Sequence, residues 1–158
     1  MARFLLLQVW RPKLTTPDLP AAETKPAIPV LVVEDDREQR ETLCAMLDLE
    51  GFQHVEAANG REALDYLNES RAPCLVLLDL EMPVMSGWDF RARQLSDARL
   101  AHIPVVIVTA NDRGLDARFP GVAGFLWKPL EFHKLAVLLD RVCNRAGTVL
   151  SRPTPAVA

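Results

Sequence analysis

Short apolar runs alternate with helix-like segments along this chain, and this alternation constrains the fold more than any other sequence feature. The runs lie at residues 29–33, 52–57, 74–78, 103–108 and 122–127. Runs of this length, rich in valine, leucine and isoleucine, are typical of strands that are buried on both faces. Strands separated by helices pair in parallel through right-handed crossovers. The chain is therefore predicted to be α/β, with a doubly wound five-stranded parallel sheet.

Helix signals fill the intervals between these runs. Asp35 and Asp36 open the first helix, and Gly51 is a plausible stop for it. Asn59 can cap the second helix with its side-chain oxygen. The other helices are expected at residues 87–95, weakly at 111–119, and around 135–142. Together with the runs, they make five β-α units in sequence.

The segments that flank this pattern differ from it in composition. Prolines recur through residues 1–27, which favours a flexible, extended segment. Its apolar run at residues 4–7 is too short to span a bilayer and is expected to be a peripheral segment that could serve in docking. Residues 147–158 are predicted to be a disordered tail, too short for an output module, so output is expected through a partner protein. One domain is therefore predicted at residues 28–146.

Charge and cysteine content limit the class of protein. The 158 residues carry a formal net charge of -3, so the chain has no basic field that would draw it to nucleic acid or to an anionic membrane. Cys44, Cys74 and Cys143 are far apart and follow no Cys/His ligand spacing, which predicts neither a zinc site nor a disulfide framework. We expect small core thiols in a reducing cytoplasm.

Acidic residues follow two of the predicted strands. Glu34, Asp35 and Asp36 come after the first strand, and Asp79 ends the third. In an open parallel sheet these positions meet at one edge, where ligands bind. Converging carboxylates repel one another, and Mg²⁺, which prefers oxygen ligands, would relieve that repulsion. The first three acids alone could simply cap a helix; Asp79 on another strand favours the metal site.

The same edge of the sheet carries groups that suit phosphoryl transfer. The carboxylate of Asp79 can attack a phosphoryl group and form an acyl phosphate. Lys128 follows the fifth strand and can neutralise phosphoryl oxygens, and Thr109 after the fourth strand offers a hydroxyl donor. Each residue also has a simpler interpretation, as a strand-ending aspartate, a surface lysine and an edge threonine.

Four sequence strings at these strand ends resemble one family. They are V-L-V-V-E-D-D at 30–36, D-L-E-M-P-V-M-S-G at 79–87, T-A at 109–110 and K-P at 128–129. In this order and at this spacing, they resemble the receiver domain of bacterial two-component response regulators over about residues 28–146. The resemblance implies a flavodoxin-like (βα)5 receiver fold.

The resemblance also implies roles for individual residues. Asp79 would be the phosphoacceptor, supplied by a sensor histidine kinase or a histidine phosphotransfer protein. Glu34, Asp35, Asp79 and the backbone carbonyl of Glu81 would hold Mg²⁺. Lys128 would pair with the phosphoryl group, and the Lys128–Pro129 bond would be cis.

Four positions receive regulatory roles from the same resemblance. Thr109 and Phe125 would form the switch that responds to phosphorylation. Glu81 and Asn111 would tune hydrolysis of the acyl phosphate. The switch would change the surface around the fifth strand and the fourth and fifth helices, which would control an unknown downstream protein. Catalysis would be limited to phosphorylation and dephosphorylation of the chain itself.

Departures from the family pattern and competing hypotheses remain. The stretch between Thr109 and Lys128 is short and contains Gly114 and Pro120, so its helix is expected to be irregular. The resemblance does not decide whether the chain forms a homodimer through that surface. A phosphorylation-independent scaffold and a receiver module of a hybrid kinase are alternatives. A haloacid-dehalogenase-type phosphatase would need aspartate where Glu81 stands, and a dinucleotide-binding domain would need a G-x-G-x-x-G that is lacking.

Overall fold

The computed structural model describes residues 28–69, 73, 75–110 and 121–145. Its elements, in chain order, are β1 (Val30–Val33), α1 (Arg37–Leu49), β2 (His54–Ala57), α2 (Gly60–Glu69), β3 (Leu75–Asp79), α3 (Gly87–Ser96), β4 (Val105–Thr109), β5 (Gly124–Trp127) and α5 (Phe132–Arg145). The helix expected at 111–119, the proline-rich segment 1–27, the tail 147–158, Cys74 and Asn111 lie outside the described residues.

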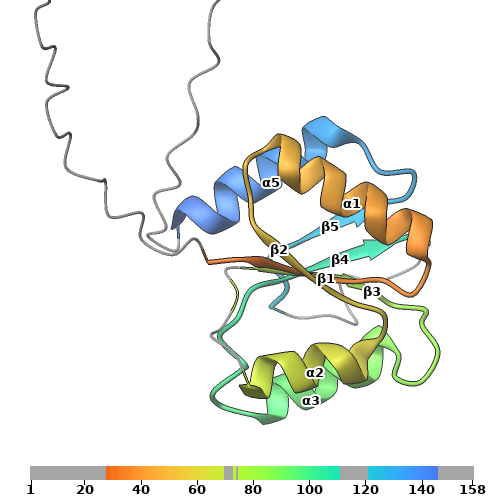
Figure 1. The fold of residues 1–158 in the computed structure, drawn as a ribbon. Coiled ribbons are helices and arrows are strands. Elements are labelled where there is room, and N and C mark those ends of the chain that lie inside the picture. Colours follow the sequence, from red (N-terminus) through yellow and green to blue (C-terminus); the bar gives the residue numbers. More distant parts are fainter. Residues whose placement is uncertain (1–27, 70–72, 74, 111–120, 146–158) are drawn as a thin grey trace, which may run out of the picture.

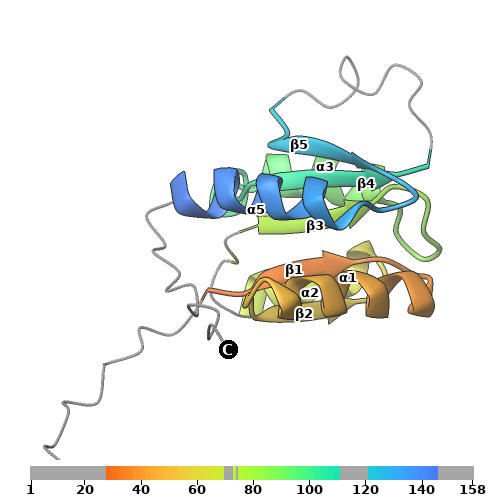
Figure 2. The same cartoon turned by 90° about the horizontal axis from the view of Figure 1, so that it is seen from above.

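The strands form one five-stranded sheet in the order β2-β1-β3-β4-β5, and every pairing is parallel. Helices α1 and α5 cover one face of this sheet, and α2 and α3 cover the other (Figures 1 and 2). The chain reverses its winding between β1 and β3, the strands beside which doubly wound folds bind ligands. The predicted doubly wound parallel sheet is confirmed.

The core consists of two apolar layers, one on each face of the sheet. Alternate residues of β1 enter opposite layers: Leu31 and Val33 join the layer under α2 and α3, and Val30 and Val32 join the layer under α1 and α5. Every residue of β1, β3 and β4 is buried. This explains why these strands appear in the sequence as continuous apolar runs and not as alternating patterns.

Helix ends form where the sequence predicts them. Asp36 caps α1, because its Oδ1 accepts a hydrogen bond of 2.9 Å from the backbone N–H of Gln39. Gly51 follows α1 with a φ of 77°, a conformation that favours glycine. The Oδ1 of Asn59 accepts from the first backbone N–H groups of α2. The strand bounds are one to two residues shorter than predicted at their amino ends.

None of the helices in the described part of the chain has the length and apolarity that a membrane crossing requires.

Candidate functional site

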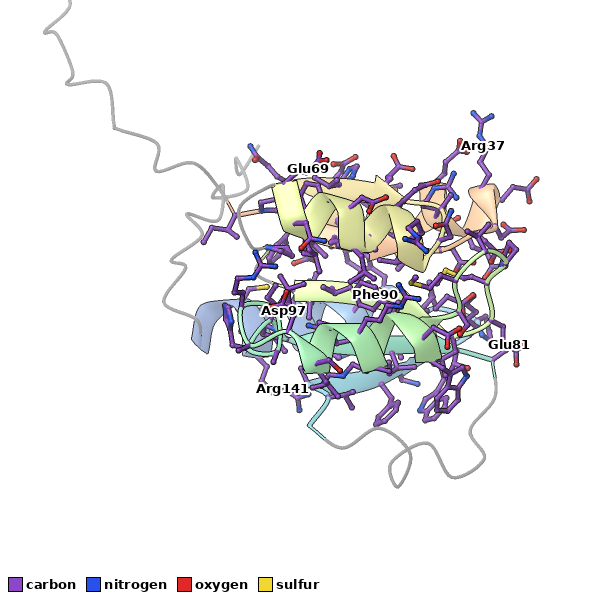
Figure 3. The ribbon with its side chains drawn as sticks, turned by 90° about the horizontal axis from the view of Figure 1, so that it is seen from below. Arg37, Glu69, Glu81, Phe90, Asp97 and Arg141 are labelled. Atoms are coloured by element: carbon purple, nitrogen blue, oxygen red, sulfur yellow. The ribbon has the colours of Figure 1, made fainter. Side chains whose placement is uncertain are left out.

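The predicted site residues meet at the carboxyl edge of the sheet. Strand pairing places Asp79 beside Val108 and Thr109 beside Trp127. Lys128 follows Trp127 directly, and its backbone N–H donates to the carbonyl oxygen of Thr109 at 2.8 Å. The ends of β3, β4 and β5 are therefore aligned at one level. Figure 3 shows Glu81, just beyond β3, at the same end of the molecule as Arg37, which begins α1.

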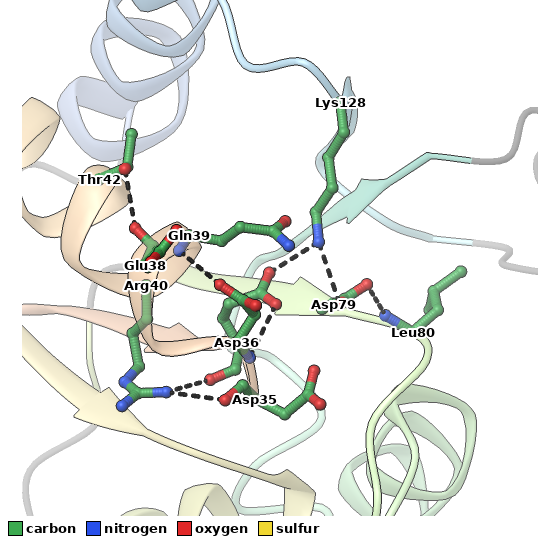
Figure 4. A network of polar contacts seen from close by, with 10 residues as sticks. Asp35, Asp36, Glu38, Gln39, Arg40, Thr42, Asp79, Leu80 and Lys128 are labelled. Carbon is green, nitrogen blue, oxygen red and sulfur yellow. Dashed lines mark hydrogen bonds and ion pairs between the residues drawn. The ribbon is translucent and has the colours of Figure 1, made fainter.

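Lys128 joins the two buried carboxylates of the site. Its Nζ lies 2.8 Å from Oε2 of Glu34 and 3.1 Å from Oδ2 of Asp79 (Figure 4). Glu34 is 1% exposed and Asp79 is 7% exposed, so both charges are largely withdrawn from water. Burial of this kind is tolerated only where charges are paired and hydrogen-bonded. One lysine therefore compensates two acids.

Backbone groups fix the remaining carboxylate oxygens. The N–H of Leu80 donates to Oδ1 of Asp79 at 2.7 Å, and the N–H of Asp36 donates to Oε1 of Glu34 at 3.3 Å. The Asp79 carboxylate is thus held from two sides, by a backbone amide and by an ammonium group. A carboxylate held in this way is oriented before any substrate arrives.

The charges of the site alter one another's protonation. Burial raises the pKa of Glu34 above its ordinary value of 4.5; the hydrogen bond from Lys128 offsets part of this rise, and the negative charge of Asp79 adds to it. Burial alone would lower the pKa of Lys128, but its hydrogen bonds and its attraction to Glu34 and Asp79 outweigh burial and raise that pKa above 10.5. Lys128 is therefore held in its charged form.

Three carboxylates of the site are close enough to share a cation. Oxygen atoms of Glu34, Asp35 and Asp79 all lie within 4.8 Å of one another. Asp35 is exposed and the other two are buried, so a cation bound between them would face solvent on one side. An all-oxygen set with an open side suits Mg²⁺, which retains several waters. The residues present fit the metal that the sequence predicts.

Arg40, which the sequence analysis does not single out, holds the acidic segment in place. Its Nη1 donates to the carbonyl oxygens of Glu34 and Asp35 at 2.8 and 3.3 Å (Figure 4). Its Nε donates to Oε2 of Glu56 on β2 at 3.0 Å. The sequence gives little sign of this role. It depends on the side chain of Arg40, one helical turn into α1, pointing back toward the end of β1, and residue spacing does not determine that direction.

A glycine allows close packing against the backbone of Asp79 and Leu80. A Cβ on Gly87 would lie 2.1 Å from the backbone oxygen of Asp79 and 2.8 Å from Cα of Leu80. The start of α3 therefore approaches the end of β3 more closely than any other residue permits. Within the same loop, Val84 has a φ of 69°, which is strained for a β-branched residue. Strain of this type clusters at functional loops.

The two residues predicted as a switch lie on one face of the sheet. Phe125 pairs with Ile107, and Thr109 pairs with Trp127, so their side chains share the α2 and α3 side by strand alternation. The ring of Phe125 stacks on Trp127 with centroids 5.9 Å apart and planes 7° apart. Thr109 is buried, and Glu81 is exposed. The Lys128–Pro129 bond is cis, as predicted.

Comparisons with known proteins agree with this arrangement. Residues 30–140 match the profile of the family described as the response regulator receiver domain. The phosphate regulon transcriptional regulatory protein PhoB of Klebsiella pneumoniae is 36% identical over 122 residues, which cover 73% of this chain and 52% of PhoB. Protein PilH of Pseudomonas aeruginosa is 30% identical over 116 residues, 72% of this chain and 95% of PilH. The chain thus spans about half the length of PhoB.

A solved structure shares the fold. It is the receiver domain of the sensor histidine kinase PA1611 from Pseudomonas aeruginosa, with a TM-score of 0.68 and 23% identity, covering 75% of this chain and 98% of that one. That structure has a magnesium ion coordinated in its active-site cleft.

Proposed function

Because the chain belongs to the response regulator receiver domain family, we propose that Asp79 accepts a phosphoryl group from a phosphohistidine and that this modification switches a signalling surface. The observation that carries the proposal is the position of Lys128, whose Nζ contacts both Glu34 and Asp79 at the carboxyl edge of the sheet. A structural ion pair would need one acid; a lysine between two acids is suited to follow a new negative charge.

In the proposed reaction, one carboxylate oxygen of Asp79 attacks the phosphorus atom of the donor. The new P–O bond forms as the P–N bond of the phosphohistidine breaks, and the departing imidazole keeps the electron pair of that bond and takes up a proton. The attacking carboxylate is already oriented by the N–H of Leu80. Lys128 then stabilises the negative charge that the transferred oxygens bring into the site.

Mg²⁺ bound at this site would neutralise charge on the incoming phosphoryl oxygens. Glu34, Asp35 and Asp79 would hold it with their carboxylates, with the backbone carbonyl of Glu81 as a further ligand. The mutual proximity of the three carboxylates supports this assignment. The magnesium found in the PA1611 receiver domain is consistent with it.

Phosphorylation of Asp79 would change the conformation of the surface through Thr109 and Phe125. Thr109 would donate its hydroxyl to the phosphoryl group, and Phe125 on the same sheet face would move in response. The altered surface would comprise β5, α5 and the segment that joins β4 to β5. Glu81 and Asn111 would set the lifetime of the acyl phosphate, and the chain would act as a switch and not as an enzyme on external substrates.

The expected partners are a sensor histidine kinase or histidine phosphotransfer protein on the input side and an unidentified protein on the output side. The proposal places the chain in the cytoplasm, with a homodimer possible and without direct contact to nucleic acid. A receiver module within a hybrid kinase is the second candidate, since PA1611, a sensor histidine kinase, contains a domain of the same fold. Phosphotransfer assays distinguish the two candidates. They compare phosphorylation of this chain by a separate histidine kinase with its phosphorylation when it is joined to a kinase in one polypeptide.

The first test is phosphorylation by acetyl phosphate, followed by intact mass. Wild type with Mg²⁺ should gain one phosphoryl group, whereas Asp79→Asn and metal-free wild type should gain none. Asp65→Asn, an exposed aspartate on α2, is the matched control and should react as wild type does. An adduct that persists in folded Asp79→Asn would refute the acceptor assignment, and failure with both acetyl phosphate and histidine kinases would favour the scaffold hypothesis.

A further inference from the structure

A second cluster of potential metal ligands lies on the other side of β1 from Asp79. Cys44 of α1 meets His54 and Glu56 of β2, and one ligand atom of each lies within 4.8 Å of the other two. His54 and Glu56 are two residues apart on an edge strand, so their side chains share the face on which α1 packs. Cys44 is buried beneath them.

The two ring nitrogens of His54 have different surroundings. Its Nε2 lies 3.1 Å from Oδ1 of Asp48, and a carboxylate can only accept, so Nε2 carries the proton. In the neutral ring this leaves a lone pair on Nδ1. That nitrogen is buried and has no hydrogen-bond partner among the described residues. Buried nitrogens are rarely left without a partner, and a carboxylate on the opposite ring nitrogen is the usual support of a metal-binding histidine.

We propose that Cys44, His54 and Glu56 form a binding site for a borderline divalent cation of the Zn²⁺ type. Sulfur, nitrogen and oxygen together are the ligand set that Zn²⁺ accepts, and three protein ligands leave a fourth position for water. This site differs from the all-oxygen edge of Glu34, Asp35 and Asp79, which suits Mg²⁺. The two sites would therefore take different ions.

The geometry of the cluster requires only small movements. Tetrahedral Zn²⁺ with ordinary bond lengths holds its ligand atoms about 3.5 Å apart. Because the three ligand atoms lie within 4.8 Å of one another, each pair would draw together by at most about 1.3 Å. Arg40 holds only Oε2 of Glu56, and the other oxygen of that half-exposed carboxylate can turn to a cation. An ion would enter past Glu56, since Cys44 is buried.

The thiol would lose its proton when the ion binds. Burial raises the pKa of Cys44 to about 11; the negative charges of Glu56, Asp48 and Glu41 add to this effect, and the positive charge of Arg40 opposes it. The metal-free thiol is therefore protonated at neutral pH. Binding forms the metal–sulfur bond and releases that proton to solvent, so affinity should rise with pH.

Co²⁺ is a suitable probe, because a cobalt–thiolate bond gives a near-ultraviolet charge-transfer band that oxygen ligands do not. The tag-free full chain is titrated with Co²⁺ in excess Mg²⁺, so that Mg²⁺ and not Co²⁺ would fill the site of Glu34, Asp35 and Asp79. Zn²⁺ is then added as a competitor. We expect one equivalent of Co²⁺, a thiolate band, and displacement by Zn²⁺. The band should be absent in Cys44→Ala, and affinity should fall at least about 10-fold in His54→Gln.

Matched variants decide the ligand assignment. Cys143→Ala removes another buried thiol, Cys74→Ala removes the third cysteine, and both should keep the band. Asp48→Ala removes the exposed partner of His54 and should weaken binding about 10-fold, whereas Glu38→Ala on the same helix should not. Circular dichroism establishes that each variant is folded. Absence of a thiolate band in wild type, or its survival in folded Cys44→Ala or Cys44→Ser, overturns the proposal.

Discussion

Lys128, which is partly buried, and Arg91, which is buried, are held by partners of opposite kinds: charged groups for Lys128 and neutral groups for Arg91. Lys128 lies between two carboxylates at the carboxyl edge of the sheet, and its pKa is raised because those charges outweigh burial. Arg91 of α3 is 5% exposed, and burial lowers its pKa. Among the described residues, no carboxylate pairs with it.

Arg91 is held by neutral groups. Its Nη1 donates to Oε1 of Gln94 at 2.8 Å, its Nη2 donates to the carbonyl oxygen of Gly121 at 3.1 Å, and its Nε is buried without a partner in the described structure. Gln94 in turn donates to the carbonyl oxygens of Leu100 and Ile103, each at 3.1 Å. This network ties α3 to the chain before β4 and before β5.

This difference in partners means that Lys128 can exchange one partner for another, whereas Arg91 cannot. In the proposed function, Lys128 moves toward a new anion while a cation from solution compensates Glu34 and Asp79. Arg91 has no such substitute, since its partners are fixed amide and carbonyl oxygens. We therefore expect the loss of Lys128 to affect function most, and the loss of Arg91 to affect stability.

Replacement of Lys128 by Met should slow phosphorylation of Asp79 by acetyl phosphate about 100-fold or more, because it removes the group that stabilises charge on the transferred oxygens. The rate is measured by intact mass against time in saturating Mg²⁺. Lys134→Met is the matched control: Lys134 is exposed and pairs with Glu131 at the start of α5, so its loss should leave the rate unchanged. An unchanged rate in folded Lys128→Met would contradict the role given to this lysine.

Replacement of Arg91 by Ala should lower the free energy of unfolding by about 3 kcal/mol, because it leaves a cavity and strands the oxygens of Gln94 and Gly121. Arg91→Met fills the volume and should lose about half as much. Urea denaturation measures both, and Arg93→Ala, at an exposed site on α3, should change stability by less than about 0.5 kcal/mol. Equal losses in the Met and Ala variants would show that the hydrogen bonds dominate over packing.

The position of Glu34, Asp35 and Asp79 at one edge of the sheet was predictable from the sequence, because chain order and hydrophobic periodicity determine it. Once five strands pair in parallel, the residues after Val33, Leu78, Val108 and Trp127 must lie at one edge, whatever the details of packing. The glycine after α1 and the caps at Asp36 and Asn59 were predictable for a similar reason, since each acts on neighbours in the chain.

Three features could not be predicted because they depend on how helices rotate against the sheet. Arg40 reaches the carbonyls of β1 only if α1 turns that face inward. The proximity of Cys44 to His54 brings together a helix residue and a strand residue whose positions in the sequence follow no known ligand spacing. The Arg91–Gln94 network places two polar residues at buried positions of α3, and the apolar pattern of the sequence does not predict that they are buried.

A double-mutant cycle should show that Arg91 and Gln94 act as one unit. The variant carrying both Arg91→Met and Gln94→Leu should lose about 1–2 kcal/mol less stability than the sum of the single losses, because the second change removes an acceptor that the first left without a donor. Urea denaturation of the four proteins measures this coupling. Additive losses would mean that the 2.8 Å contact between the two side chains contributes nothing.

Mg²⁺ should stabilise the acidic edge and leave the Arg91 network unaffected, which is the smallest of the expected effects. At one fixed concentration, ten times the dissociation constant of the wild type, Mg²⁺ should raise the free energy of unfolding of the wild type by about 1.4 kcal/mol. Arg91→Met should show the same increment as wild type, whereas Asp35→Asn, a change at an exposed ligand, should show a smaller one.

Lys128→Met should respond more strongly than wild type, because the repulsion between Glu34 and Asp79 is then relieved by the ion alone. Thermal unfolding with Mg²⁺ and with EDTA measures these increments, and Asp65→Asn on α2 controls for nonspecific binding to acids. If Lys128→Met gained no more than wild type, the lysine and the metal would not be alternative partners of the same two carboxylates, and the contrast drawn with Arg91 would fail.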